Sequence, residues 1–371
     1  MQLKALFLIF LSGLSVAAVL PEDRADMLYH RYEGGGMTIQ GPSVLVRKSV
    51  KEKVSVSANY YVDKVSAASI DVLTSASPYE EERKQKSVGV DLLSGKAIYS
   101  FGYTASDESD YNARTYSFGA SQDFFGDLTT VSFGYAQGDD DVSRSGDPFF
   151  SEEAKRRHFR FGLTQVLTKT WLAALSHEAI TDEGFLNNPY RSVRYETGTG
   201  YSFQAENYPN TRTSEATALR SSHYLPWRAA LHAEYRRFED SWGIESSDWG
   251  FRFVQPVGKH WEAELRYREY EQTAADFYSD LFPFQDAQNF LARDKELSTF
   301  DSTSLGVALS WEFYRNRSRF LERMAIRVSV DDYRFDYKDF RDIRVTGVPP
   351  GAEPLYSFDA QVTQVLLSAW Y

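Results

Sequence analysis

The sequence lacks cysteine, an excess of basic residues and long apolar segments, and each absence excludes a class of protein. Without cysteine the chain cannot form disulfides, thiolate-ligated zinc sites, iron–sulfur clusters or thiol nucleophiles. With 52 acidic and 41 basic side chains and a net charge of −11, it lacks the basic surface of a nucleic-acid-binding protein. After the N-terminus no segment approaches about 18 consecutive apolar residues, which excludes a polytopic helical membrane protein.

The N-terminus has the features of an export signal. Lys4 is followed by an apolar run and then by small residues at Ala17 and Ala18. This order predicts a secretory signal peptide over residues 1–18, cleaved after Ala18 or alternatively after Ala17. We therefore expect a single exported domain over residues 19–371.

Most of the remaining sequence alternates between apolar and polar residues. The pattern is clear over residues 54–62, 99–104 and 304–311, and aromatic residues make up 15 % of the chain. A period of two predicts strands with one apolar and one polar face. Tight turns alternate with longer polar segments along the chain, which is the layout of an outer-membrane barrel with short periplasmic turns and long extracellular loops.

The predicted fold is all-β: a transmembrane, antiparallel, up-and-down β-barrel. Sixteen strands are expected near residues 27–32, 37–50, 53–66, 86–94, 96–106, 112–125, 128–138, 156–168, 170–181, 212–225, 227–240, 246–257, 260–273, 299–314, 322–338 and 356–371. Because the first strand is weak, fourteen strands remain an alternative.

The C-terminus carries a separate indication of the same fold. Residues 358–371 alternate and end on Trp370 and Tyr371. This ending resembles the signal by which the barrel-assembly machinery recognises its clients. Trp171 and Trp261 lie beside predicted turns, as expected for side chains that anchor a barrel at the membrane interface.

If the apolar face of each strand meets lipid, a set of charged residues shares the opposite, lumen-facing parity. These candidates are Arg228, Glu234, Arg236, Arg252, Glu262, Glu264, Arg266 and Arg268. One interpretation is a selectivity region that orients solutes in transit and favours anions. The other is a network of salt bridges that stiffens the wall, and the sequence does not decide between them.

No motif points to catalysis or to a bound cofactor. The acidic string at residues 138–147 departs from the EF-hand spacing, and the six histidines lack a metal-binding pattern. No G-x-S-x-G motif occurs. Residues 80–82 and 106–110 are interpreted as charged loop tips. We therefore expect no enzyme, cofactor or metal, and we keep a barrel enzyme only as a minor alternative.

Several long strings carry a family resemblance: LPEDRADMLYHRYEGGGMTIQGPSVLVRKSV at 20–50, VSVSANYYVDKVSAASIDVLTSASPYEEER at 54–83, SQDFFGDLTTVSFGY at 121–135 and AITDEGFLNNPYRSVRY at 179–195. Together they resemble a Gram-negative outer-membrane family of unknown function, DUF3570, over about residues 20–371. The resemblance implies an outer-membrane β-barrel and supplies no substrate or catalytic residue.

The leading functional hypothesis is a porin-like outer-membrane channel for passive passage of small polar or charged solutes. The alternative is a structural or assembly barrel that conducts little, which an inward fold of the long segment Asp182–Thr211 would favour. Expected partners are outer-membrane lipid and lipopolysaccharide, the barrel-assembly machinery and a periplasmic or lipoprotein partner, with no nucleic acid.

Overall fold

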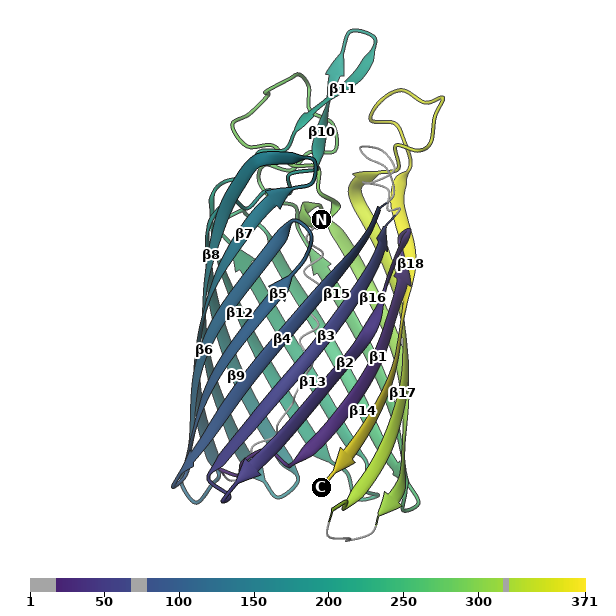
Figure 1. Cartoon of the computed structure of the whole chain (residues 1–371). Coiled ribbons are helices and arrows are strands. Elements are labelled where there is room, and N and C mark those ends of the chain that lie inside the picture. The colour runs from purple at the N-terminus through teal and green to yellow at the C-terminus, as the bar shows by residue number, and fades with distance from the viewer. Residues whose placement is uncertain (1–17, 68–78, 316–319) are drawn as a thin grey trace.

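A computed structural model describes residues 18–67, 79–315 and 320–371 of the chain. It is a closed β-barrel with tilted strands (Figure 1). Apart from Ala18, the expected signal peptide lies outside the described residues. In the described part of the chain, no helix is long and apolar enough to cross a membrane.

Sixteen antiparallel strands form the barrel, and β18 pairs with β1 to close it. They are β1 Arg24–Gly34, β2 Met37–Val50, β3 Val54–Ala67, β4 Tyr79–Ser94, β5 Ala97–Asp107, β6 Tyr111–Phe124, β7 Thr129–Arg144, β8 Asp147–Thr168, β9 Trp171–Gly184, β12 Thr211–Tyr224, β13 Ala230–Asp240, β14 Glu245–Val257, β15 Trp261–Gln272, β16 Phe300–Arg315, β17 Arg323–Arg341 and β18 Leu355–Trp370. A separate hairpin consists of β10 Ser192–Thr197 and β11 Gly200–Ala205, and one 3₁₀ helix, η1, spans Lys295–Leu297.

The expected count of sixteen strands is confirmed, and the fourteen-strand alternative is wrong. Two strands begin well before their predicted starts: β4 at Tyr79 and β8 at Asp147. The polar segment at residues 138–154, between two predicted strands, is expected from the sequence to be a loop. In the structure most of it extends the β7–β8 hairpin, and the pairing continues from Asp140 and Ala154 to the tip of the hairpin. This extension is rich in acidic residues and places Phe149 beside Phe150, so it lacks the alternation of apolar and polar residues that marks a strand.

Alternate residues of each strand face opposite sides of the barrel wall. The outer face carries large apolar side chains that are half exposed, such as Phe101, Phe133 and Leu265. Their neighbours on the inner face are polar, small or charged. This orientation is favoured because an arginine on the outer face near the middle of a bilayer would cost about 2–4 kcal/mol.

The two ends of the barrel differ in their connections. At one end, called the turn end, short links join the strands at residues 51–53, 95–96, 125–128, 169–170, 225–229 and 258–260. The other end, called the loop end, carries the long segments 185–210, 273–299 and 342–354. The β10–β11 hairpin projects from the loop end, beyond the rim of the barrel (Figure 1).

Candidate functional site

One side of the lumen is dense in charge. Strands β12 to β17 direct charged side chains inward, and the set is here called the charged wall: Arg220, Glu234, Arg236, Asp248, Arg252, Glu262, Glu264, Arg266, Arg268, Arg327 and Asp331. Strand register places them on one face, because His232 pairs with Arg252 and Arg252 pairs with Arg266.

Glu264 is the centre of this wall. Its side chain is almost fully buried, and Arg266 Nη1 and Arg327 Nη2 each donate a hydrogen bond of 2.9 Å to its Oε1. Arg252 Nη1 lies 3.9 Å from its Oε2. A single carboxylate therefore shares its charge among three guanidinium groups.

Three further ion pairs use Asp331, Asp248 and Glu234. Arg266 donates two hydrogen bonds to Asp331, from Nε at 2.9 Å and from Nη2 at 2.7 Å. Arg268 Nη2 lies 3.2 Å from Asp248 Oδ2. Paired charges of this kind stiffen the wall and reduce the positive field that the arginines would otherwise produce in the lumen.

The pair of Arg220 and Glu234 extends the wall to β12, with Arg220 Nε donating to Glu234 Oε2 at 2.5 Å.

The eight candidates from the sequence do not all join this wall. Seven lie on the inner face, but Arg228 lies in the turn at residues 225–229, exposed and before β13 begins. The expectation that Arg228 points into the lumen is wrong, because Pro226 and the backbone bond from Arg228 N to Leu225 O extend the turn by three residues. Sequence reasoning omitted Arg220, which completes the wall from β12.

Part of the opposite side of the lumen is lined by small side chains. Strands β3 to β7 present Ser57, Ser87, Gly89, Ser100, Gly102, Thr104, Ser117, Gly119, Ser121, Ser132 and Gly134 on the inner face, and this set is called the smooth wall. Its hydroxyl groups bond locally, as in the 2.6 Å bond from Ser100 Oγ to Asp91 Oδ1. Small hydroxyl and glycine residues leave space and hydrogen-bonding capacity on this side.

Four loop-end segments pack together into a structure here called the cap: residues 185–210, 241–244, 273–299 and 342–354. A buried apolar core joins the first three through Tyr208, Trp242 and Phe277. A parallel bridge between Tyr195 and Phe282 and an antiparallel bridge between Asn207 and Leu291 tie the β10–β11 segment to residues 273–299.

The cap rests on inner-face side chains at the loop end of the barrel. Tyr278 packs against a buried aromatic cluster that includes Tyr337 and Phe358, both on the inner face. Next to this cluster, on the adjacent strand β1, Tyr32 is close enough to Lys295 to interact with it electrostatically. Residues 273–299 therefore cover inner-face side chains on the β17, β18 and β1 side of the mouth, whereas the β10–β11 hairpin projects outward (Figure 1).

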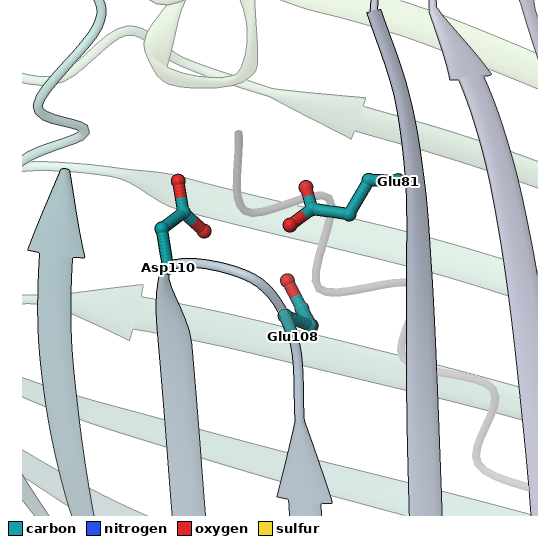
Figure 2. Close-up of side chains that lie close together, drawn as sticks. All are labelled: Glu81, Glu108 and Asp110. Atoms are coloured by element: carbon teal, nitrogen blue, oxygen red, sulfur yellow. The ribbon is translucent and has the colours of Figure 1, made fainter. Parts of the chain in front are cut away.

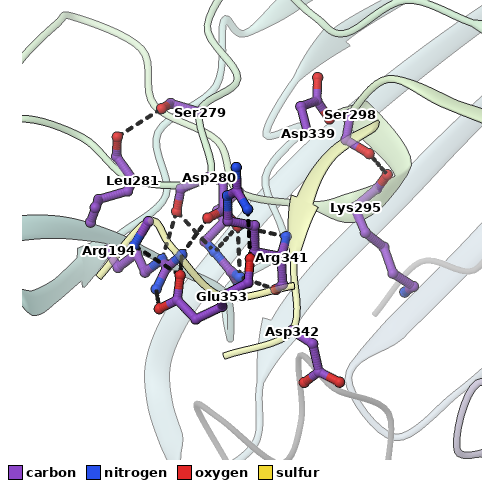
Figure 3. A network of polar contacts seen from close by, with 12 residues as sticks. Arg194, Ser279, Asp280, Leu281, Lys295, Ser298, Asp339, Arg341, Asp342 and Glu353 are labelled. Atoms are coloured by element: carbon purple, nitrogen blue, oxygen red, sulfur yellow. Dashed lines mark hydrogen bonds and ion pairs between the residues drawn. The ribbon is translucent and has the colours of Figure 1, made fainter. Parts of the chain in front are cut away.

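A buried network of charges holds the cap segments together (Figure 3). Arg194 of β10 has 0 % side-chain exposure, and its Nη1 donates to Glu353 Oε1 at 2.6 Å. Its Nη2 also donates to Asp280 Oδ2. Arg293 Nη2 donates to Asp280 Oδ1 at 2.9 Å, and Arg341 Nη1 donates to the Glu353 carbonyl at 2.5 Å. One arginine thus links three segments that are remote in sequence.

A second buried charge lies beside this network. Glu206 accepts hydrogen bonds from the Tyr208 hydroxyl at 2.6 Å and from the backbone N–H of Arg293 at 2.8 Å. Complete burial raises the pKa of Glu206 to about 7, although nearby Arg191 opposes the shift. The protonation of this carboxyl group therefore changes close to neutral pH.

Three carboxylates meet near the loop end (Figure 2). Glu81 of β4 lies beside Glu108 and Asp110 of the β5–β6 connection, with one oxygen of each within 4.8 Å of the others. Ser109 Oγ donates to Glu81 at 2.7 Å, and burial raises the pKa of Glu108 to about 7. Oxygen ligands suit Mg²⁺ or Ca²⁺, so these residues could hold such an ion. In the sequence these residues belong to two separate charged segments, residues 80–82 and 106–110. The pairing of β4 with β5 brings the two segments together.

The C-terminal residues close the barrel. Trp370 pairs with Arg24 of β1 and Arg323 of β17, and the Arg323 guanidinium lies 4.0 Å from the centre of its ring. The Tyr371 hydroxyl donates to the Arg47 carbonyl at 3.0 Å. The residues expected to form an assembly signal therefore also lie in the seam that joins the two ends of the sheet.

The fold resembles solved outer-membrane barrels at low sequence identity. A "bacterial polysaccharide outer membrane secretin" matches with a TM-score of 0.52 and 7 % identity, over 95 % of this chain and 99 % of the other. The outer membrane protein opdK from Pseudomonas aeruginosa matches with 0.44 and 11 %, over 94 % and 99 %. The alcaligin receptor FauA from Bordetella pertussis matches with 0.43 and 12 %, over 94 % and 58 %.

No curated protein matches the sequence. One family model does match, over residues 70–347, which is most of the chain and lies within the expected range of 20–371. Its description is "Protein of unknown function (DUF3570)". The chain thus belongs to the DUF3570 family, and its fold is that of an outer-membrane β-barrel.

Proposed function

We propose that this protein is an outer-membrane channel through which small polar or charged solutes diffuse. The observation that carries the proposal is the asymmetric lumen of a closed sixteen-strand barrel, with the charged wall on one side and the smooth wall on the other. Barrels of this size leave an aqueous interior rather than a packed core. Charge on one side and space on the other would orient a polar solute as it passes.

In this proposal the loop end faces the cell exterior and the turn end faces the periplasm, as is general for such barrels. The outer face contacts lipid and lipopolysaccharide. The barrel-assembly machinery inserts the chain, with Trp370 and Tyr371 as part of its signal. The cap then lies at the external mouth, where it limits entry.

A second candidate is a structural barrel that conducts little and holds a periplasmic or lipoprotein partner. The cap favours it, because residues 273–299 cover inner-face side chains on one side of the mouth and the buried Arg194 network fastens them there. The two candidates differ in one measurable property, the conductance of the isolated barrel.

Planar-bilayer recordings of the purified full chain test the proposal. We expect discrete open-state currents, and a barrel that inserts but stays silent would reject the channel in favour of the second candidate. A lumen variant tests whether the current passes through the interior of the barrel. Gly119→Arg adds a long side chain to the smooth wall, where its Cβ meets only ordinary contacts of 3.6 Å or more. Its unitary conductance should fall, while the outer-face control Ala120→Leu should leave it unchanged.

A further inference from the structure

The arginines of the charged wall are not equally neutralised. Arg266, Arg268 and Arg220 each have a carboxylate within 3.3 Å, and Arg327 shares Glu264 at 2.9 Å. These four guanidinium groups act mainly as ties between strands. Their charge is largely cancelled at short range, so they contribute little to attracting a solute.

Arg236 and Arg252 are different. No carboxylate of the described residues lies within ion-pair distance of Arg236. Arg236 does interact electrostatically with Glu178, but that carboxylate is already held by Arg160 at 3.3 Å and His158 at 3.2 Å. Arg252 has only the shared Glu264 at 3.9 Å, and its side chain is 35 % exposed.

The two arginines lie on either side of a gap in the wall. Arg236 pairs in register with Asp248, and Arg252 pairs with His232, so Gly250 lies between them on the inner face. A Cβ placed at Gly250 would meet only Glu234 Cβ, at 3.9 Å. The inner surface is therefore recessed at this point. Arg252 lies two positions from the glycine on β14, and Arg236 lies beside Asp248 on its other side, while Glu234 and Arg268 flank Gly250 in register.

We propose that Arg236 and Arg252 form an anion-binding step in the lumen, at the recess over Gly250. The ligand class is small anions that carry a carboxylate or phosphate group, because a guanidinium binds both groups through paired hydrogen bonds. This inference rests on the proposed channel function and specifies the class of solute. The net charge of the whole chain is negative, so the preference is local to this recess.

Reversal potentials across a KCl gradient test the step. Wild-type channels should pass chloride more readily than potassium. In the double variant Arg236→Gln/Arg252→Gln the chloride-to-potassium permeability ratio should fall by about twofold or more at 0.1 M salt. The fall should be larger at 0.01 M, where the Debye length grows to about 30 Å. The charge-preserving variant Arg236→Lys/Arg252→Lys should keep most of the preference.

The matched control removes a lumen ion pair that lies outside the charged wall, without changing the net charge: Arg156 Nε of β8 donates to Asp182 Oδ1 of β9 at 2.6 Å. In Arg156→Gln/Asp182→Asn the permeability ratio should stay close to the wild-type value. Two outcomes would contradict the anion step without contradicting the channel function. One is a double arginine variant that conducts with unchanged selectivity, and the other is a wild-type channel without anion preference. A silent wild-type barrel would instead overturn the channel itself.

Two measurements do not depend on the folding of the double arginine variant. Phosphate added to wild-type channels should reduce the chloride current at concentrations where the neutral solute glycerol does not. The variant Gly250→Asp places a carboxylate in the recess and should lower the anion preference with both arginines intact. Absence of block together with unchanged selectivity in Gly250→Asp would contradict the proposal.

Discussion

Arg266 of β15 reaches across β16 to bind Asp331 of β17, and it can do so because the intervening residue is Gly306. Two hydrogen bonds, of 2.9 and 2.7 Å, join the side chains over this glycine. A Cβ at position 306 would lie 1.8 Å from Asp331 Oδ1 and 3.0 Å from Arg266 Nε. The glycine is therefore required for space, and the pair ties together three strands.

This arrangement predicts the effect of a single methyl group. Gly306→Ala should separate Arg266 from Asp331 and lower the free energy of unfolding by about 1–3 kcal/mol, because the partly buried Asp331 loses two hydrogen bonds and Arg266 keeps only Glu264. Urea unfolding of the refolded barrel measures the change. Gly134→Ala is the control, since its Cβ would meet only Arg160 Cβ at 3.6 Å. Equal stability of the two variants would show that the pair can reorganise without loss.

The Arg194 network predicts a local effect on the cap. Arg194→Met would leave Glu353 buried without its main partner and Asp280 with only Arg293, and breaking a buried ion pair typically costs about 3–5 kcal/mol. The cap should then open to limited proteolysis at residues 273–299 while the barrel keeps its heat-resistant migration. Arg344→Met, which removes an exposed pair with Asp342, should have an effect below about 1 kcal/mol. A protease-resistant Arg194 variant would contradict this role.

The absence of cysteine allows the cap to be locked by design. Asn207 and Leu291 exchange two backbone hydrogen bonds, of 3.0 and 2.7 Å, so cysteines at these positions are within disulfide reach. The oxidised Asn207→Cys/Leu291→Cys variant should conduct less than its reduced form, because residues 273–299 can no longer move from the mouth.

The control for this lock is Glu196→Cys/Tyr201→Cys, which links β10 to β11 within the hairpin and leaves residues 273–299 free. Its conductance should not respond to reductant. If both pairs behave alike, movement of the cap does not control entry.

Glu206 predicts a pH dependence for the cap. Its pKa of about 7 in the folded cap exceeds the ordinary value of 4.5, so the folded state retains a proton that the unfolded segment has lost between these values. Its contribution to stability is therefore full below about pH 4.5 and is lost as the pH rises through 7, by on the order of 3 kcal/mol. Hydrogen exchange at the Asn207 and Leu291 amides should accelerate over this range, after correction for intrinsic rates.

Glu206→Gln removes the titrating group while keeping a hydrogen-bond acceptor. Its cap should exchange at a rate that does not depend on pH after the same correction. A pH response that persists in Glu206→Gln would assign the effect to another group.

The C-terminus predicts an effect on biogenesis. Deleting Trp370 and Tyr371 should abolish insertion, since it removes both the expected assembly signal and contacts of the closing seam with Arg323 and Arg47. Immunoblots of membrane fractions should show loss of the truncated chain. The variant Arg323→Gln keeps the signal and removes one seam contact, so it should still insert. Normal levels of the truncated chain would reject the assembly signal.

The sequence by itself determined the sixteen strands and the face of most side chains. Alternation such as that of residues 54–62 is a local property, because a strand that borders lipid on one side must be apolar at every second position. For the same reason, parity placed Arg252 and Arg266 in the lumen. It failed at Arg228, where the turn is longer than the pattern indicates. It also failed at β8, whose early part has two phenylalanines side by side and does not alternate.

Only the tertiary structure decided which charges meet. Arg266 binds Asp331 rather than a neighbour on β16 because strand register and the space over Gly306 allow it. Arg194 and Glu353, 159 residues apart, meet because four loop segments pack into one cap. Neither contact leaves a periodic pattern in the sequence, since each depends on the positions of segments distant along the chain. The recess between Arg236 and Arg252 likewise exists only once β13 and β14 are in register.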